Sequence, residues 1–131
     1  MTYEDLLARI IADGLAEVRV AYADPKDHHK RDGAIEGFEA CRGKHPAALL
    51  ELWTEAERKG QQLFHDRNPS GADNYWRQRY KALQIEFVLN VVSVGLAQAG
   101  QPPLLSHLPT VRGAMKYAEI VGVHDASAVL S

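Results

Sequence analysis

The fold is decided by residues 72–98, ADNYWRQRYKALQIEFVLNVVSVGLAQ. Apolar side chains recur there at spacings of three and four residues: Trp76, Tyr80, Leu83, Phe87, Val91 and Val94. This period is typical of one face of an α-helix, and it favours helix even across the run 91–94, which alone would suit a strand. The stretch therefore predicts one continuous helix, roughly 40 Å long, whose second half is apolar on nearly every face.

Shorter helices are expected on both sides of this long helix. Amphipathic periodicity, capping residues and turn residues predict helices over about residues 3–23, 27–42, 46–65 and 110–121. We therefore expect an all-α domain, a four- to five-helix bundle over residues 1–123 with the helix 72–98 at its centre. Residues 124–131 are expected to form a loosely ordered tail.

Two of the shorter helices carry features that bear on packing. Gly33 and Gly37 lie four residues apart, so they leave one face bare and let a neighbouring helix approach closely. Each glycine weakens its own helix by about 1 kcal/mol relative to alanine. The expected core face of the helix 46–65 consists of Leu49, Leu52, Trp53, Ala56, Leu63 and Phe64.

The composition is that of an ordinary globular protein. Of 131 residues, 46% are apolar and 24% are charged, and the formal net charge is -2, without the basic excess that nucleic-acid and membrane-surface proteins usually show. The single cysteine, Cys41, fits a reducing compartment. No secretory signal is visible, and polar residues and prolines interrupt the uncharged stretch 87–111. We expect a soluble, cytoplasmic protein.

The apolar second half of the helix 72–98 raises the question of what covers it. A helix that is apolar on every face must be covered on every face, and the helices 27–42 and 46–65 are too short to do this alone. A symmetric homodimer would bury the remaining surface. The alternative is that the segment 104–121 of the same chain covers it.

A polar stripe interrupts this helix. Arg79, Glu86, Asn90 and Ser93 are seven, four and three residues apart, so they lie on one face. A carboxylate or amide within an apolar run must be paired or hydrogen-bonded. The stripe is interpreted either as a binding or catalytic pocket inside the bundle, with Glu86 as acid, base or ligand anchor, or as a structural network that fixes helix register.

Glu39 and Arg42 form a second candidate feature. Three residues apart, they can pair with each other on a solvated face, or reach Arg79 or Glu86 if the two helices are neighbours. The residues proposed to bind a ligand are Glu39, Arg42, Arg79, Glu86 and Asn90.

No metal site, cofactor or catalytic residue is expected. No glutamate is followed by histidine three residues later, as a di-iron bundle requires, and no two histidines are four residues apart, as in a helical zinc site. No glycine-rich phosphate loop or nucleophile elbow occurs. Cys41 is interpreted as a small buried hydrophobic residue because no activating partner is visible.

Two features resemble patterns found in nucleic-acid-binding proteins. Aromatic and cationic residues alternate over residues 75–81, although simple amphipathicity, with Arg77 and Lys81 pointing outward, explains the pattern. Residues 117–124 resemble the turn of a helix-turn-helix, but the following segment is too short and too poor in basic residues to read DNA.

These patterns favour a non-enzymatic, homodimeric helical module that binds a partner protein or a small ligand. The first alternative is a small-ligand-binding protein or enzyme with a pocket around Glu86, and the second is a nucleic-acid-associated regulator. The sequence looks like that of a small bacterial-type helical protein, but no residue pattern identifies a family.

Overall fold

The computed structural model describes residues 3–66 and 72–98. The described residues form the α-helices α1 (Tyr3–Ala21), α2 (His28–Ala40), α3 (Pro46–His65) and α4 (Ala72–Gln98), with the short 3-10 helix η1 (Pro25–Asp27) before α2. The prediction of an all-α fold is confirmed for this part of the chain, which contains no strand. The expected fifth helix, the tail and the helix-turn-helix resemblance lie outside the described residues.

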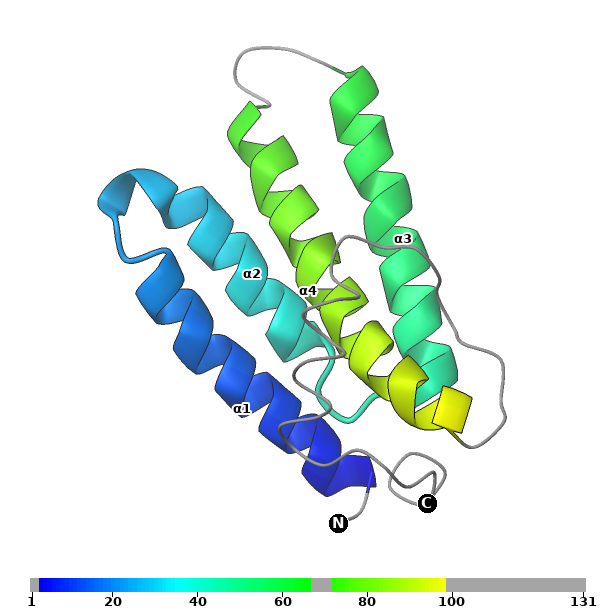
Figure 1. The fold of residues 1–131 in the computed structure, drawn as a ribbon. Helices are drawn as coiled ribbons and strands as arrows, with labels where there is room; N and C mark the ends of the chain where they lie inside the picture. Colours follow the sequence, from blue (N-terminus) through cyan, green and yellow to red (C-terminus); the bar gives the residue numbers. More distant parts are fainter. Residues whose placement is uncertain (1–2, 67–71, 99–131) are drawn as a thin grey trace.

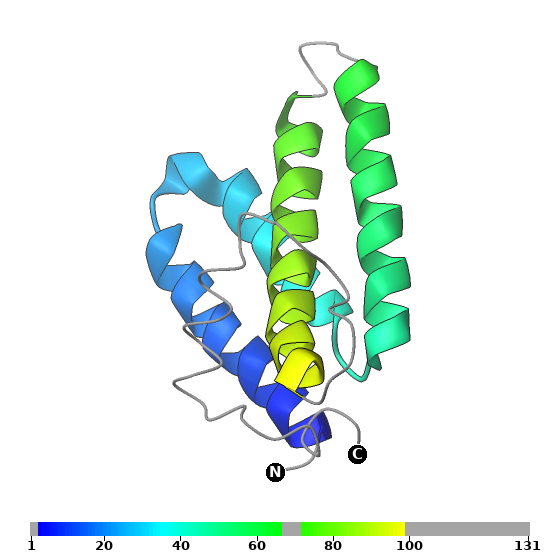
Figure 2. The same cartoon turned by 45° about the vertical axis from the view of Figure 1, so that its right-hand side comes forward.

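The four α-helices pack side by side (Figures 1 and 2). Helix α4 lies between α2 and α3 and packs mainly against these two, while α1 packs on α2 and also reaches α4. The amino end of α1 and the carboxyl end of α4 lie at the same end of the molecule in both views. None of the described helices has an apolar stretch long enough to cross a membrane.

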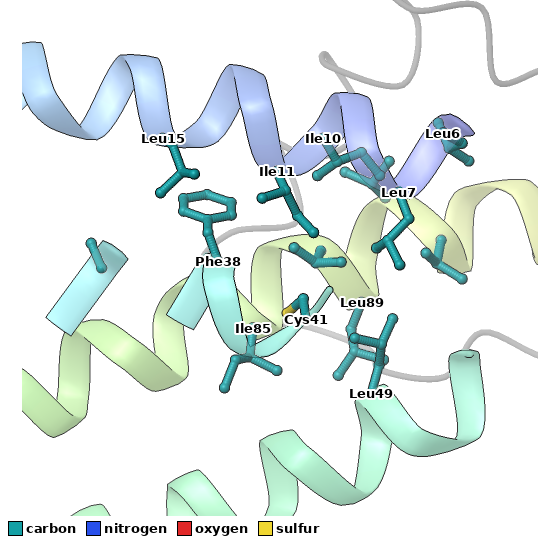
Figure 3. Packing of buried hydrophobic residues seen from close by; sticks show 14 of the residues in the cluster. Leu6, Leu7, Ile10, Ile11, Leu15, Phe38, Cys41, Leu49, Ile85 and Leu89 are labelled. Carbon is teal, nitrogen blue, oxygen red and sulfur yellow. The ribbon is translucent and has the colours of Figure 1, made fainter. Parts of the chain in front are cut away.

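The core lies where α1, α2 and α4 meet, and α3 closes one side of it (Figure 3). The largest fully buried side chains include Leu6, Ile10 and Ile11 of α1, Leu49 of α3, and Ile85, Val88 and Leu89 of α4. Phe38, in the last turn of α2, and Cys41, directly after α2, pack into the same cluster. Leu6 and Ile10 are four residues apart and Ile11 follows directly, so the three form one buried face of α1.

Capping hydrogen bonds and a left-handed glycine stabilise the connections between the helices. Asp24 caps η1, because its Oδ1 accepts a hydrogen bond of 3.1 Å from the backbone N–H of Lys26. Gly43 has a φ of 68°, a left-handed conformation that favours glycine, in the connection from α2 to α3. The Tyr3 hydroxyl donates a 2.6 Å hydrogen bond to the carbonyl of Lys44, which ties the start of α1 to this connection. Burial raises the pKa of that hydroxyl.

The bare face of α2, at which the sequence predicted the close approach of a neighbouring helix, contacts α4. A Cβ added to Gly33 would lie 2.1 Å from the carbonyl oxygen of Arg77, and one added to Gly37 would lie 2.5 Å from that of Lys81. The two backbones therefore touch directly, which only glycine allows.

Two aromatic residues that were expected in the core are partly exposed. Trp76 is 48% exposed and Phe64 is 44% exposed, so the prediction that both point inward is wrong. Trp76 is exposed because α2 approaches α4 at the backbone of Arg77 and Lys81. This contact lies beside the predicted apolar face of α4 rather than on it. For the same reason Lys81 is half-buried, although it was predicted to point outward.

In the second half of α4, the side chains that the structure describes, up to Ser93, are mostly buried within a single chain. Val88, Leu89, Val91 and Val92 are each 0% exposed. The burial of these four residues therefore requires no second copy of the protein, and the homodimer stays a prediction.

Candidate functional site

The polar stripe of α4 is divided between a buried and an accessible part. Glu86, Asn90 and Ser93, here called the polar row, are 3%, 3% and 4% exposed, and none of them is without a partner. Arg79, seven residues before Glu86, is accessible to solvent. It pairs with Glu57 of α3, with 2.9 Å between Nη1 of Arg79 and Oε1 of Glu57. Arg79 therefore belongs to the contact between α3 and α4.

Glu39 and Arg42 lie on an exposed surface and pair with each other. Arg42 donates hydrogen bonds to Glu39 from Nε over 2.5 Å and from Nη2 over 3.1 Å. The hydrogen bond from Arg42 lowers the pKa of the Glu39 carboxyl. Of the two arrangements that the sequence left open, the structure has the local pair, so Glu39 and Arg42 do not join Arg79.

A groove between α3 and α4, of about 280 Å³, brings Arg79 together with residues that the sequence did not single out. We call it the α3–α4 groove. Its lining consists of Ala56, Glu57, Gly60, Gln61, Phe64 and His65 of α3 and Tyr75, Gln78, Arg79 and Ala82 of α4. The lining therefore combines apolar and aromatic side chains with polar and charged ones. Glu86 and Asn90 are not part of this lining.

Among the glycines of residues 3–66, Gly60 is the one whose position the packing of the described helices does not explain. Gly33 and Gly37 touch α4, Gly14 touches the ring of Phe38, and Gly43 has a positive φ. A Cβ on Gly60 would meet only the Cγ of Gln78, at an ordinary 3.9 Å. The missing side chain at Gly60 leaves open space in the groove. A glycine within a helix lowers helix stability by about 1 kcal/mol relative to alanine, so this space reduces the stability of α3.

Aromatic rings continue from this groove across α4. We call them the aromatic row: Phe64, Tyr75, Trp76, Tyr80 and Tyr22. Successive ring centroids are 5.7, 5.2, 6.4 and 5.4 Å apart. The ammonium group of Lys30 lies over the Tyr80 ring, 5.6 Å from its centroid. The row presents rings to the surface on α3 and α4, with Phe64 and Trp76 the most exposed large apolar side chains among them.

No metal centre is formed by the described residues, because no three His, Cys, Asp or Glu side chains among them gather closely enough to hold an ion. The Cys41 thiol is buried and donates a hydrogen bond of 3.3 Å to the carbonyl of Gly37. Burial raises the pKa of this thiol to about 12.

Cys41 is expected to resist alkylation in the folded protein. Because the thiolate is the reacting species, a pKa of about 12 instead of 9.0 lowers its reactive fraction about a thousandfold near neutral pH. The rate of reaction with iodoacetamide at pH 8, measured with and without urea, tests this. The unfolded chain is the control, and equal rates in both states would contradict the buried position of the thiol.

The chain matches no protein-family model, no curated protein and no solved structure. The functional argument therefore rests on the geometry of its own residues.

Proposed function

We propose that this protein is a non-enzymatic, cytoplasmic helical module that associates with a second copy of itself through the α3–α4 groove. The observation that carries the proposal is a pair of exposed rings: Phe64 lines the groove, and Trp76 lies beside it, in contact with the lining residue Tyr75. Aromatic residues are enriched at the centres of protein interfaces, where they contribute much of the binding energy.

Gly60 supports a protein as the occupant of this groove. Glycine lets a backbone approach closely, as Gly33 and Gly37 do between α2 and α4 within the chain. A helix from outside would find at Gly60 the same kind of bare surface. The proposal thus explains a glycine that the packing of residues 3–66 and 72–98 does not require.

The ion pair between Arg79 and Glu57 supplies the polar part of the surface. The two side chains are 36% and 24% exposed, so they remain in contact with solvent at the wall of the groove. Partly exposed pairs of this kind add little affinity, but they fix orientation and select partners. The same role would apply to a partner protein of different sequence.

Self-association is expected at micromolar concentration, and it should depend on the two exposed rings. Trp76→Ala and Phe64→Ala are each expected to weaken the dimer at least about tenfold, because truncation of an aromatic interface residue typically costs more than 1 kcal/mol. Sedimentation equilibrium or light scattering over a concentration series measures this change.

Val20→Ala is the matched control, because Val20 is an apolar residue of α1 that is 79% exposed and belongs neither to the groove nor to the aromatic row. This variant should dimerise like the wild type, and circular dichroism should show that all three variants remain folded. A wild-type protein that stays monomeric at about 100 µM, or a dimer that both ring variants leave intact, would refute the proposed interface.

A further inference from the structure

The α3–α4 groove has two unlike ends, with Gly60 between them. At one end lie the rings of Phe64 and Tyr75, whose centroids are 5.7 Å apart. At the other end Glu57 and Arg79 form the ion pair that joins α3 to α4. The groove therefore presents an aromatic end and an ionic end on one continuous surface.

The spacing of residues on α3 makes this surface complementary to itself. Glu57 and Phe64 are about two helical turns apart, so they lie on the same side of α3, separated by about 10 Å along its axis. Gly60 and Gln61 lie midway between them. A two-fold axis perpendicular to α3 at this midpoint would bring Phe64 of one copy to Glu57 of the other. It would also bring Gln61 of each copy to the bare backbone of Gly60, as an isologous interface requires.

The residues that this arrangement brings together are open to solvent. Phe64 is 44% exposed, and the side chains of Arg79 and Glu57 are 36% and 24% exposed. Gln61 is exposed and Gly60 is half-buried. A second copy can therefore reach each of these residues while the packing of α3 on α4 stays as it is.

The aromatic end and the ionic end attract each other. A guanidinium group is planar and weakly hydrated, so it stacks on an aromatic ring while its N–H groups bind a carboxylate. An N–H bond lies in the plane of the group, so the hydrogen bond from Nη1 of Arg79 to Glu57 does not occupy the face that a ring would cover. The same kind of contact occurs within the chain, where the ammonium group of Lys30 lies 5.6 Å from the Tyr80 centroid.

A parallel arrangement of the two α3 helices is less favourable than an antiparallel one. About a two-fold axis parallel to α3, each residue would face its own copy. Glu57 would then meet Glu57 and Arg79 would meet Arg79, and like charges in contact weaken an interface. The antiparallel arrangement avoids this repulsion and also opposes the dipoles of the two helices.

We propose that the dimer is antiparallel about Gly60 and Gln61, with the Phe64 ring of each copy stacked on the Arg79 guanidinium group of the other. This inference rests on the proposed self-association through the α3–α4 groove, and it assigns each groove residue its contact in the second copy. It explains why an exposed ring and an accessible ion pair occur in one groove, since each is the binding surface for the other. The contact forms twice in each dimer.

The test is an isotope-filtered NOE experiment on an equal mixture of ¹³C,¹⁵N-labelled and unlabelled chains. The filter records only contacts between a labelled and an unlabelled chain, so contacts within one copy do not appear. NOEs are expected from the ring protons of Phe64 to the δ protons of Arg79, and from the α protons of Gly60 to the side chain of Gln61. Sedimentation equilibrium of the same mixture measures whether the dimer is present.

The two measurements separate this arrangement from the interface on which it rests. If sedimentation shows a monomer, the proposed interface fails and the arrangement fails with it. If a dimer is present but its NOEs connect Phe64 to Phe64, or connect Phe64 to no residue of the groove, only the antiparallel arrangement is overturned.

Arg79→Lys is expected to weaken the dimer about fivefold, because lysine keeps the charge but lacks the planar group that covers a ring. Arg58→Lys is the matched control, since Arg58 is an exposed arginine of α3 that pairs with Glu55 outside the groove. The control variant should keep the dissociation constant of the wild type in sedimentation equilibrium, and circular dichroism should show that both variants are folded. Equal dissociation constants for the two lysine variants would contradict the stacked contact.

Discussion

Replacing Gly33 by alanine is expected to destabilise the protein by about 2 kcal/mol or more. The added methyl group would lie 2.1 Å from the backbone oxygen of Arg77, closer than any tolerated contact, and a backbone cannot rotate away as a side chain can. Overpacking costs about 1–3 kcal/mol and sometimes more, which exceeds the roughly 1 kcal/mol that alanine gains over glycine in a helix. Helix α4 would have to move away from α2.

Gly37→Ala should have the same sign and a smaller size. Its methyl group would lie 2.5 Å from the carbonyl oxygen of Lys81, so the required displacement is smaller. Urea unfolding followed by circular dichroism measures both variants through the midpoint of the transition.

Gly60→Ala is the matched control for these two substitutions, because it adds the same methyl group within a helix of the same bundle. Its nearest neighbour would be 3.9 Å away, so the helix propensity of alanine should raise the stability by about 0.5–1 kcal/mol. If Gly33→Ala unfolds at the same urea concentration as the wild type, the close contact between α2 and α4 is wrong. The Gly60 variant also bears on the interface, because it should weaken the proposed dimer while it stabilises the monomer.

The helices were predictable because their signals are local. The apolar period and the turn residues predicted the bounds of α3 and α4. The helix predicted over 3–23 extended past the end of α1, and the one predicted over 27–42 extended past both ends of α2. The bare face at Gly33 and Gly37 was predictable for the same reason, since two residues four apart on a helix share a face whatever surrounds them.

The positions of Trp76 and Phe64 were not predictable in this way. Periodicity identifies the apolar side of a helix, but the neighbouring helix decides which part of that side is covered. In α4 the neighbour is fixed by the glycines of α2, which bring it to the backbone of Arg77 and Lys81. That information lies about forty residues away in the sequence, where no local pattern refers to it.

In the candidate site too, features set by local sequence were predictable and contacts between helices were not. Burial of Glu86 and Asn90 was predictable because apolar residues surround them in the sequence, and both are 3% exposed. The partner of Arg79 was not predictable from the sequence, because Glu57 lies on another helix. Gly60 was visible in the sequence as a glycine within an amphipathic helix, but its meaning required knowing that no other part of the described chain approaches it closely.

Removing the charge or the amide of the polar row is expected to destabilise the fold strongly. Glu86→Ala should cost about 3 kcal/mol, because Glu86 is buried, has a partner, and would leave that partner unsatisfied beside a cavity. Asn90→Leu should cost about 2 kcal/mol for the same reason, although leucine is the more hydrophobic side chain. The urea midpoint again measures both effects.

The sign of the Asn90→Leu effect separates the two interpretations of the polar row. A structural network loses stability when one member becomes apolar, because the hydrogen-bonding groups that remain are buried without partners. A ligand pocket behaves in the opposite way, since polar groups kept for binding usually reduce stability and an apolar replacement restores it. A more stable Asn90→Leu variant would therefore contradict the structural interpretation and revive a pocket around Glu86.

Glu51→Gln is the control for the loss of a carboxylate, paired with Glu86→Gln. Glu51 is an exposed residue of α3, so its change to an amide should leave the midpoint in place. Glu86→Gln keeps the shape of the side chain but can no longer accept hydrogen bonds at both ends, so it should fall between the wild type and Glu86→Ala. If the two glutamine variants unfold alike, the buried carboxylate does not hold α4 in register, and the arrangement of the bundle must rest on the glycine contact and the apolar core alone.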